Sequence, residues 1–115
     1  MKFDKFENII CWQKAEKLTT QIYLHFKNFK DFSFRDQICR ASVSIMNNIA
    51  EGYERMGNKE FCKFLYIAKG SSAEVRSMLH LAFELKYISR ENYDELNNQA
   101  LEISRMLSGL IKSLK

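Results

Sequence analysis

Proline is absent from all 115 residues of this chain, and only four residues are glycine. Proline breaks a helix interior, and glycine weakens one by about 1 kcal/mol relative to alanine. A chain that avoids both residues over its whole length is suited to long helices with few turns. The sequence therefore predicts an all-α fold. At this length we expect one domain, which buries roughly two-thirds of the surface that the unfolded chain exposes.

Apolar residues recur at intervals of three and four along four segments, which is the repeat of a helix with one buried face. The expected helices of this single domain, 1–115, span about residues 8–28, 35–56, 59–86 and 90–113. The connections between them are short. Four such helices are typical of an up-down-up-down four-helix bundle.

Polar residues at the expected helix starts are candidates for N-caps, because their side chains can accept a hydrogen bond from a free backbone N–H group. Asn8 is the candidate for the first helix, Ser33 or Asp36 for the second, and Ser89 for the fourth. Met56-Gly57-Asn58 is expected to end the second helix and to begin the third. The four helices thus have predicted boundaries as well as predicted faces.

The stretch from Arg40 to Arg55 separates apolar from polar residues more sharply than any other part of the chain. At about 100° per residue its apolar residues cover an arc of roughly 200°, which is wider than one buried stripe needs. A narrow polar band occupies the other side and consists of Gln37, Arg40, Ser44, Asn47, Asn48, Glu51 and Arg55. The band fits either a hydrogen-bond network with a neighbouring helix or a recognition surface.

Two apolar seams run along the third expected helix. The first comprises Phe61, Phe64, Leu65, Ala68, Ser72, Val75, Leu79, Ala82 and Phe83. The second is rotated by roughly 140° from the first and comprises Ile67, Gly70, Glu74, Met78, Leu81 and Leu85. A helix in a lone bundle needs one seam, so the second predicts contact with another copy of the chain through Ile67, Gly70, Met78 and Leu81. A glycine inside a helix suggests a close approach to the backbone, by a partner helix in the first place; a phosphate, or an evolutionary accident without structural meaning, is the alternative.

The fourth expected helix carries a heptad seam, because its apolar residues are separated alternately by three and four positions. They are Tyr93, Leu96, Ala100, Ile103, Leu107, Leu110 and Leu114. The seam extends over three repeats. It predicts that this helix packs lengthwise against its neighbours in the bundle.

The three cysteines, Cys11, Cys39 and Cys62, are widely spaced and form no Cys-x-x-Cys pair. We expect small buried or half-buried thiols in a reducing compartment. The N-terminal residues contain no apolar core of signal-peptide length, and no run of the sequence is long enough to span a bilayer. These features predict a cytoplasmic protein that makes no use of a membrane.

Motifs for catalysis or metal binding are missing from the sequence. The residue three positions before His25 is isoleucine and that before His80 is serine, so neither histidine completes the Glu-x-x-His motif of metal-binding bundles. There is no His-Glu-x-x-His, Gly-rich phosphate loop or Gly-x-Ser-x-Gly. We expect no metal, no cofactor, no catalytic residue and no enzyme. The enzyme alternative rests on Glu51 and Glu74, and requires a cleft holding both carboxylates without arginine partners.

The formal net charge is +4 and the sequence pI is near 9.0, which is compatible with a polyanionic partner but does not specify one. The basic residues are scattered, so one copy carries only a modest patch. A ring of copies would repeat that patch, and phosphate binding strengthens with the number of neutralised charges. The candidate cations are Lys27, Lys30, Arg35, Arg40, Arg55, Lys59, Lys63, Lys69 and Arg76. Of these, Arg40, Arg55, Lys63, Lys69 and Arg76 are the expected nucleic-acid contacts.

Residues of the first three expected helices form a specific signature. It consists of Phe6, Ile9, Trp12 and Ala15; Gln37, Arg40-Ala41, Ser44-Ile45, Asn48-Ile49-Ala50-Glu51-Gly52 and Arg55; and Glu60-Phe61, Phe64-Leu65, Ala68, Gly70-Ser71 and Glu74. With this signature the chain resembles the bacterial four-helix bundle proteins encoded by intervening sequences of the 23S ribosomal RNA gene. That family is related to the accessory protein of diversity-generating retroelements. Many members carry proline before the second helix and inside it near Met46, whereas this chain has none.

The resemblance implies a four-helix protomer that assembles into a homo-oligomer, typically a pentameric barrel. It also implies a basic surface, which in the retroelement relative binds nucleic acid and the reverse transcriptase. It implies no enzyme. Two functions therefore stay open: binding of RNA or DNA through basic residues, and a protein-interaction scaffold that docks a partner such as a reverse transcriptase or a ribosomal factor. Self-association agrees with the second seam of the third helix, although that seam does not supply the number five.

Overall fold

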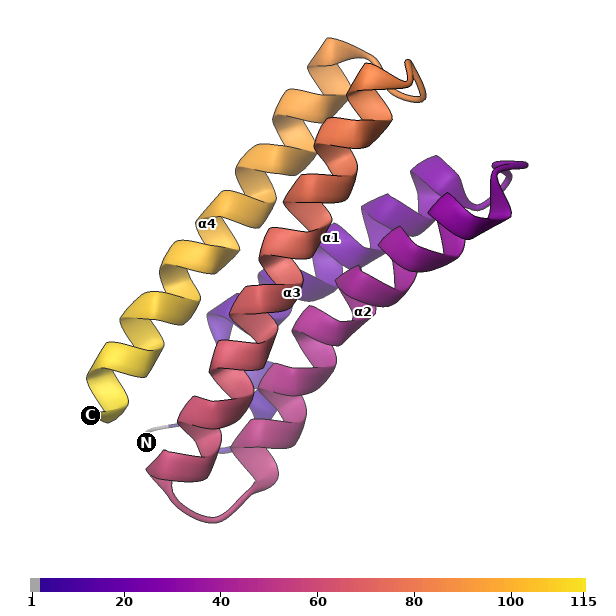
Figure 1. The fold of residues 1–115 in the computed structure, drawn as a ribbon. Coiled ribbons are helices and arrows are strands. Elements are labelled where there is room, and N and C mark those ends of the chain that lie inside the picture. The colour runs from indigo at the N-terminus through magenta and orange to yellow at the C-terminus, as the bar shows by residue number, and fades with distance from the viewer. Residues whose placement is uncertain (1–2) are drawn as a thin grey trace.

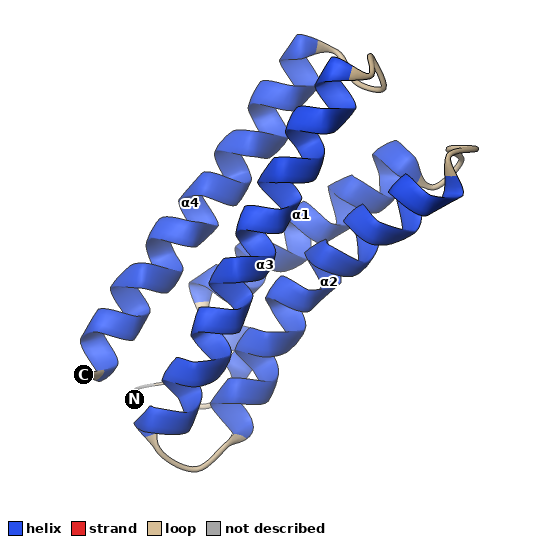
Figure 2. Ribbon diagram, in the orientation of Figure 1, coloured by secondary structure: helices blue, strands red, loops and turns tan. Residues whose placement is uncertain are grey.

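The computed structural model describes residues 3–115. A short 3-10 helix, η1 (Phe6–Asn8), precedes α1 (Ile10–Phe26), α2 (Phe32–Glu54), α3 (Asn58–Glu84) and α4 (Arg90–Leu114). The described chain consists of helices and loops (Figure 2). Consecutive helices pack side by side and α4 returns to α1, within a body of 43 × 21 × 19 Å (Figure 1). The expected all-α four-helix bundle is confirmed.

Asp31 caps α2, because its Oδ1 atom accepts a hydrogen bond from the backbone N–H of Phe34 at 3.1 Å. The helix consequently begins at Phe32, earlier than the expected residue 35. The prediction of Ser33 or Asp36 as the cap was wrong. Both residues lie within the first turns of the helix, since a capable side chain stands just before them.

The other two predicted caps have different outcomes. Ser89 caps α4 as expected, with its side chain accepting a hydrogen bond from the backbone N–H of Asn92 at 3.0 Å. The prediction for Asn8 was wrong, because that residue belongs to η1 and α1 begins after Ile9. Gly57 occupies the N-cap position just before α3 with a φ of 91°, in the left-handed region that glycine adopts without strain.

One apolar core runs through the four helices. Its largest fully buried side chains are Phe26, Ile9, Leu18, Ile22, Ile38, Ile45, Ile49, Leu65, Leu79, Leu96, Ile103 and Leu107. Burial of each such side chain contributes about 1.5–3 kcal/mol. Near the end of α4 the core takes in Ile111, while Leu110 of the predicted heptad seam is only partly buried. A straight helix drifts by about 20° per heptad relative to a strict seven-residue repeat, and over the three repeats this drift turns Leu110 away from the core and Ile111 toward it.

The α1–α2 and α3–α4 pairs diverge toward their connections (Figure 1). Aromatic side chains join the two pairs there. The ring of Tyr87 packs edge-on against Phe29 and Phe34, each at 5.3 Å between centroids. Its hydroxyl donates a hydrogen bond to Oδ2 of Asp31 at 2.7 Å. That hydrogen bond, with a smaller contribution from the N–H of Phe34, holds the pKa of Asp31 below its usual value. The α2 cap is thus tied to the α3–α4 connection.

The polar band of α2 forms a hydrogen-bond network with α3. The hydroxyl oxygens of Ser44 and Ser71 lie 2.8 Å apart. Asn48 donates from Nδ2 to the backbone oxygen of Ser44 at 2.8 Å and to its hydroxyl at 3.0 Å. Gln37 donates to Glu74 at 3.2 Å. Of the two interpretations left open by the sequence, the inter-helix network is confirmed for these members of the band.

Candidate nucleic-acid interface

The groove between α3 and the end of α4, called here the α3–α4 groove, concentrates positive charge. It encloses about 240 Å³ and is lined by Tyr66, Lys69, Ser108, Ile111, Lys112 and Lys115. Three lysines thus line one hollow, and the lining found within residues 3–115 includes no carboxylate side chain. Lys112 and Lys115 share a face because they are three residues apart on α4. Lys69 joins them from the side of α3 that packs on α4.

Tyr66 holds one of these lysines in place. Nζ of Lys115 donates a hydrogen bond to the Tyr66 hydroxyl at 3.1 Å and lies 5.4 Å from the centre of its ring. The hydrogen bond to Tyr66 raises the pKa of Lys115, so the ammonium group stays charged at neutral pH. Lysines at the end of a helix also interact favourably with the helix dipole, so these side chains stabilise α4 as well.

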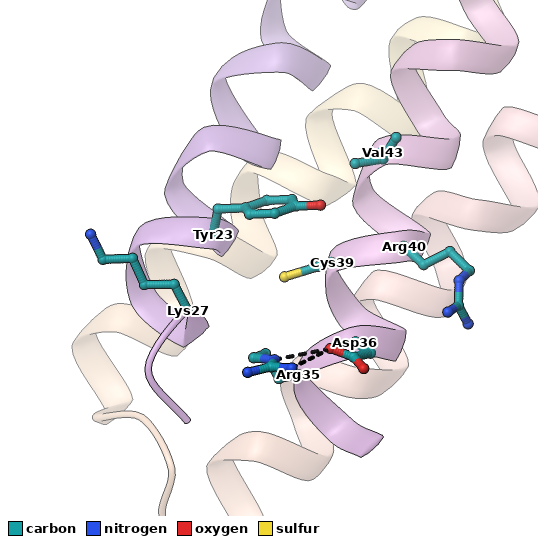
Figure 3. A pocket seen from close by; sticks show the side chains of 7 residues that line it. All are labelled: Tyr23, Lys27, Arg35, Asp36, Cys39, Arg40 and Val43. Atoms are coloured by element: carbon teal, nitrogen blue, oxygen red, sulfur yellow. Dashed lines mark hydrogen bonds and ion pairs between the residues drawn. The ribbon is translucent and has the colours of Figure 1, made fainter. Parts of the chain in front are cut away.

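A second groove, the α1–α2 groove, lies toward the opposite end of the bundle and encloses about 450 Å³. Its lining residues are Tyr23, Lys27, Arg35, Asp36, Cys39, Arg40 and Val43. Figure 3 shows the ring of Tyr23 reaching from α1 toward α2 and the sulfur of Cys39 pointing into the gap between these helices. The groove combines an apolar floor with three cations and one carboxylate.

Arg35 in this groove already has partners. Its Nε and Nη2 atoms each lie 2.9 Å from Oδ1 of Asp36, and its guanidinium group lies 4.8 Å from the centre of the Phe32 ring. The carboxylate of Asp36 is therefore neutralised locally. An exposed pair of this kind contributes little to stability and can exchange partners at low cost.

All three cysteines are free and buried, as expected. Burial raises the pKa of the Cys11 thiol to about 11. Burial, with a smaller contribution from the charge of Asp36, also raises the pKa of the Cys39 thiol. Because the thiolate is the reactive form, both thiols are unreactive at neutral pH, and Cys39 presents a neutral surface to the α1–α2 groove.

The five predicted nucleic-acid contacts do not share one site. Arg40 lies in the α1–α2 groove and Lys69 in the α3–α4 groove. Arg55 is bound to Glu51 at 2.9 Å, with its guanidinium group 4.8 Å from the Phe64 ring centre. Lys63 lies 3.3 Å from Glu60. Arg76 is half-buried against the bundle, and its Nε atom has no hydrogen-bond partner in the part of the chain that the structure describes.

Lys112 and Lys115 were missed by the sequence-based prediction. A signal was present, since Ser108, Ile111, Lys112 and Lys115 recur at intervals of three and four and must share one face of a helix. Their connection with Lys69 was not visible in the sequence, because it depends on how α4 packs against α3.

The second seam of α3 lies on the outside of the bundle. Ile67, Leu81 and Leu85 expose 52%, 46% and 47% of their surfaces, and Gly70 is exposed between them. Met78 is partly buried and packs against the core. Large apolar side chains exposed along one side of α3 and at its C-cap can form an interaction surface.

Glu51 and Glu74 do not have the geometry that the enzyme alternative requires. Glu51 forms an ion pair with Arg55 at 2.9 Å, and Glu74 accepts a hydrogen bond from Gln37. Within residues 3–115 no group of three or more His, Cys, Asp and Glu side chains is arranged to hold a metal ion. None of the helices described combines the length and the apolar character needed to cross a membrane.

The bundle and its grooves place this chain among the all-α four-helix proteins. Its sequence matches the 23S rRNA-intervening sequence proteins over residues 7–109, and the chain belongs to this family. A solved structure from Bacteroides thetaiotaomicron VPI-5482, a protein with unknown function from the S23 ribosomal protein family, is similar. The two chains are 30% identical with a TM-score of 0.83, over 89% of this chain and 98% of the other. No curated protein matches the sequence.

Proposed function

We propose that this protein is a non-enzymatic homo-oligomer that binds RNA or DNA by the phosphate backbone. The α3–α4 groove carries the proposal, because the three lysines Lys69, Lys112 and Lys115 line one hollow. Lysines that neutralise phosphates release counterions from the nucleic acid, and this release supplies sequence-independent affinity. The family's connection with 23S rRNA makes a structured RNA the first ligand to test.

In a homo-oligomer each copy would contribute one α3–α4 groove. The exposed seam of α3, with Ile67, Gly70 and Leu81 on the surface and Met78 at its edge, is the proposed contact with a second copy. The resemblance described from the sequence makes a pentamer the expected assembly. A pentamer would repeat the three-lysine groove around a ring and so bind several phosphates at once. Affinity would then rise steeply with the number of grooves that one nucleic acid reaches.

The test is the binding of purified, nucleic-acid-free protein to labelled structured RNA and duplex DNA, followed by anisotropy across a salt series. The Lys69→Glu/Lys112→Glu variant is expected to bind at least about tenfold more weakly at low salt, and to lower the salt slope by about one to two. Its matched control is Lys14→Glu/Lys17→Glu, which makes the same change in net charge on α1, where Lys14 lies 3.3 Å from Glu102.

The control should lose much less affinity, because it alters only the overall charge. Equal losses in both variants would show that net charge governs binding and that the α3–α4 groove is not the contact. An absence of binding by the wild-type protein at low salt would contradict the proposal itself.

A second candidate function is the docking of a protein partner, such as a reverse transcriptase or a ribosomal factor. The exposed apolar side chains of Ile67, Leu81 and Leu85 favour it, since such a face suits a partner helix as well as a second copy. Partner binding that persists at high salt and fails in a Leu81→Asp variant of unchanged assembled mass would support this function over nucleic-acid binding.

A further inference from the structure

We propose that the α1–α2 groove binds an unpaired nucleotide of single-stranded nucleic acid, with the base stacked on Tyr23 and the adjoining phosphates held by Lys27 and Arg40. This inference rests on the proposed function and adds the class of nucleic acid to it. It is carried by a different groove from the one that supports phosphate binding.

The groove has the size and the floor that a base requires. Its volume of about 450 Å³ lies within the range of about 300–1,000 Å³ that is common for small-ligand sites. Tyr23 leaves 45% of its surface exposed and its ring reaches over the gap between α1 and α2 (Figure 3). Val43 and the uncharged thiol of Cys39 complete an apolar lining. A flat aromatic heterocycle can pack there against a tyrosine ring, as bases do in proteins that bind single strands.

The charges flank this floor on two sides. Lys27 extends from the end of α1 and Arg40 from α2, each away from the middle of the groove (Figure 3). Within residues 3–115 neither side chain forms an ion pair, whereas Asp36 is held by Arg35. A nucleotide within a strand has a phosphate before it and another after it. Two free cations on opposite sides of an aromatic floor match that arrangement.

The apolar floor of the α1–α2 groove, formed by Tyr23, Cys39 and Val43, can distinguish unpaired from paired bases. In a duplex both faces of a base are covered by its neighbours, so a tyrosine ring can stack only on a base that has left the helix or was never paired. The α3–α4 groove is less suited to a base, because the Tyr66 hydroxyl accepts a hydrogen bond from Lys115 at 3.1 Å and three lysines line the hollow beside it. The α1–α2 groove, where Tyr23 lies beside Val43 and Cys39, is therefore the better match for an unpaired base.

Tyr66 supplies a matched control, since it is a tyrosine of similar exposure, 50%, in the other groove. The experiment compares Tyr23→Ala, Tyr23→Phe and Tyr66→Ala in the purified protein of residues 1–115. The probes are labelled oligo(U), oligo(dT) and an RNA duplex of the same length, and binding is followed by anisotropy. Circular dichroism and assembled mass show that each variant is intact, which is expected for half-exposed positions.

Tyr23→Ala should weaken binding of the single strands by about 5- to 150-fold, which is the usual effect of losing one stacked base. Its affinity for the duplex should stay within about twofold of the wild-type value. Tyr23→Phe should retain single-strand binding because the ring is kept. Tyr66→Ala frees Lys115 in the α3–α4 groove, so any loss of affinity should be equal for single strands and duplex, and the ratio of the two affinities should stay that of the wild type. The ratio of oligo(U) to oligo(dT) affinity shows whether RNA or DNA is preferred.

A Tyr23→Ala variant that binds single strands as well as the wild type, or that loses duplex binding equally, would overturn this inference and leave the proposed function standing. If the wild-type protein binds none of the three probes, both the inference and the proposed function are wrong. A wild-type preference for the duplex would likewise contradict the inference alone.

Discussion

Two glycines inside helices differ in their surroundings, since Gly52 is closely packed and Gly70 is open. A Cβ added to Gly52 of α2 would lie 2.6 Å from the Cβ of Phe64 and 3.1 Å from Cδ1 of Phe61, so α2 and α3 are in close contact there. A Cβ added to Gly70 of α3 would meet no heavy atom of the described residues within 4 Å. A helical glycine therefore does not by itself show a close approach. At Gly52 the neighbour belongs to the same chain, whereas at Gly70 any close neighbour must come from another molecule.

The largest effect is expected at Gly70 if a second copy covers it. Gly70→Leu should dissociate the proposed oligomer while leaving the helical signal intact, because the new side chain would occupy the space of the partner helix. Sedimentation or light scattering measures the assembled mass. Gly109→Leu makes the same change at an exposed glycine of α4 and should leave the mass unaltered. An unchanged mass for Gly70→Leu would remove Gly70 from the assembly contact.

The second-largest effect is expected for Gly52→Ala, which should lower the stability of the folded chain and not its assembly. The extra methyl group overlaps Phe64, and overpacking of a core typically costs about 1–3 kcal/mol, which outweighs the helix propensity that alanine adds. Urea unfolding should therefore show a lower midpoint at unchanged slope. A midpoint equal to that of the wild type would show that α2 and α3 can separate at this point without cost.

The smallest effect compares alanine at the two exposed glycines. In a free protomer, Gly70→Ala and Gly109→Ala should each raise the free energy of unfolding by up to about 1 kcal/mol, because alanine favours the helix. In an assembly in which a second copy packs closely on Gly70, only Gly109→Ala should raise the free energy of unfolding. Unfolding measured at low and high protein concentration separates these cases. An equal gain in both variants at high concentration would argue against a helix packed on Gly70.

The sequence predicted the helices well but chose the wrong cap for α2, for a physical reason. Asp31, Ser33 and Asp36 can all cap a helix, and their local sequence does not rank them. Asp31 is the cap, and its second carboxylate oxygen accepts the Tyr87 hydroxyl. Tyr87 lies 56 residues away along the chain. Ser89 had no comparable competitor, and its prediction was confirmed.

In the candidate site, too, contacts within one helix could be predicted from the sequence, whereas contacts between helices could not. The ion pair between Glu51 and Arg55 follows from their spacing of four residues on one helix, so the sequence alone indicates it. The contact between Ser44 and Ser71 joins α2 to α3 and depends on how these helices pack. The sequence also could not predict that Gly70 is exposed, with no neighbouring element of the described chain packed against it. A glycine in a helix has the same local sequence pattern whether or not another element packs against it.

The sequence by itself determined where the helices run and which face of each is buried, because both depend on residues within a few positions of one another. The tertiary structure decided which polar and charged side chains share a groove. Lys69 meets Lys112 and Lys115 only after α4 has packed on α3, and Tyr23 faces Val43 only after α1 has packed on α2. Their positions follow from the packing of whole helices against one core, which the local pattern of residues does not contain.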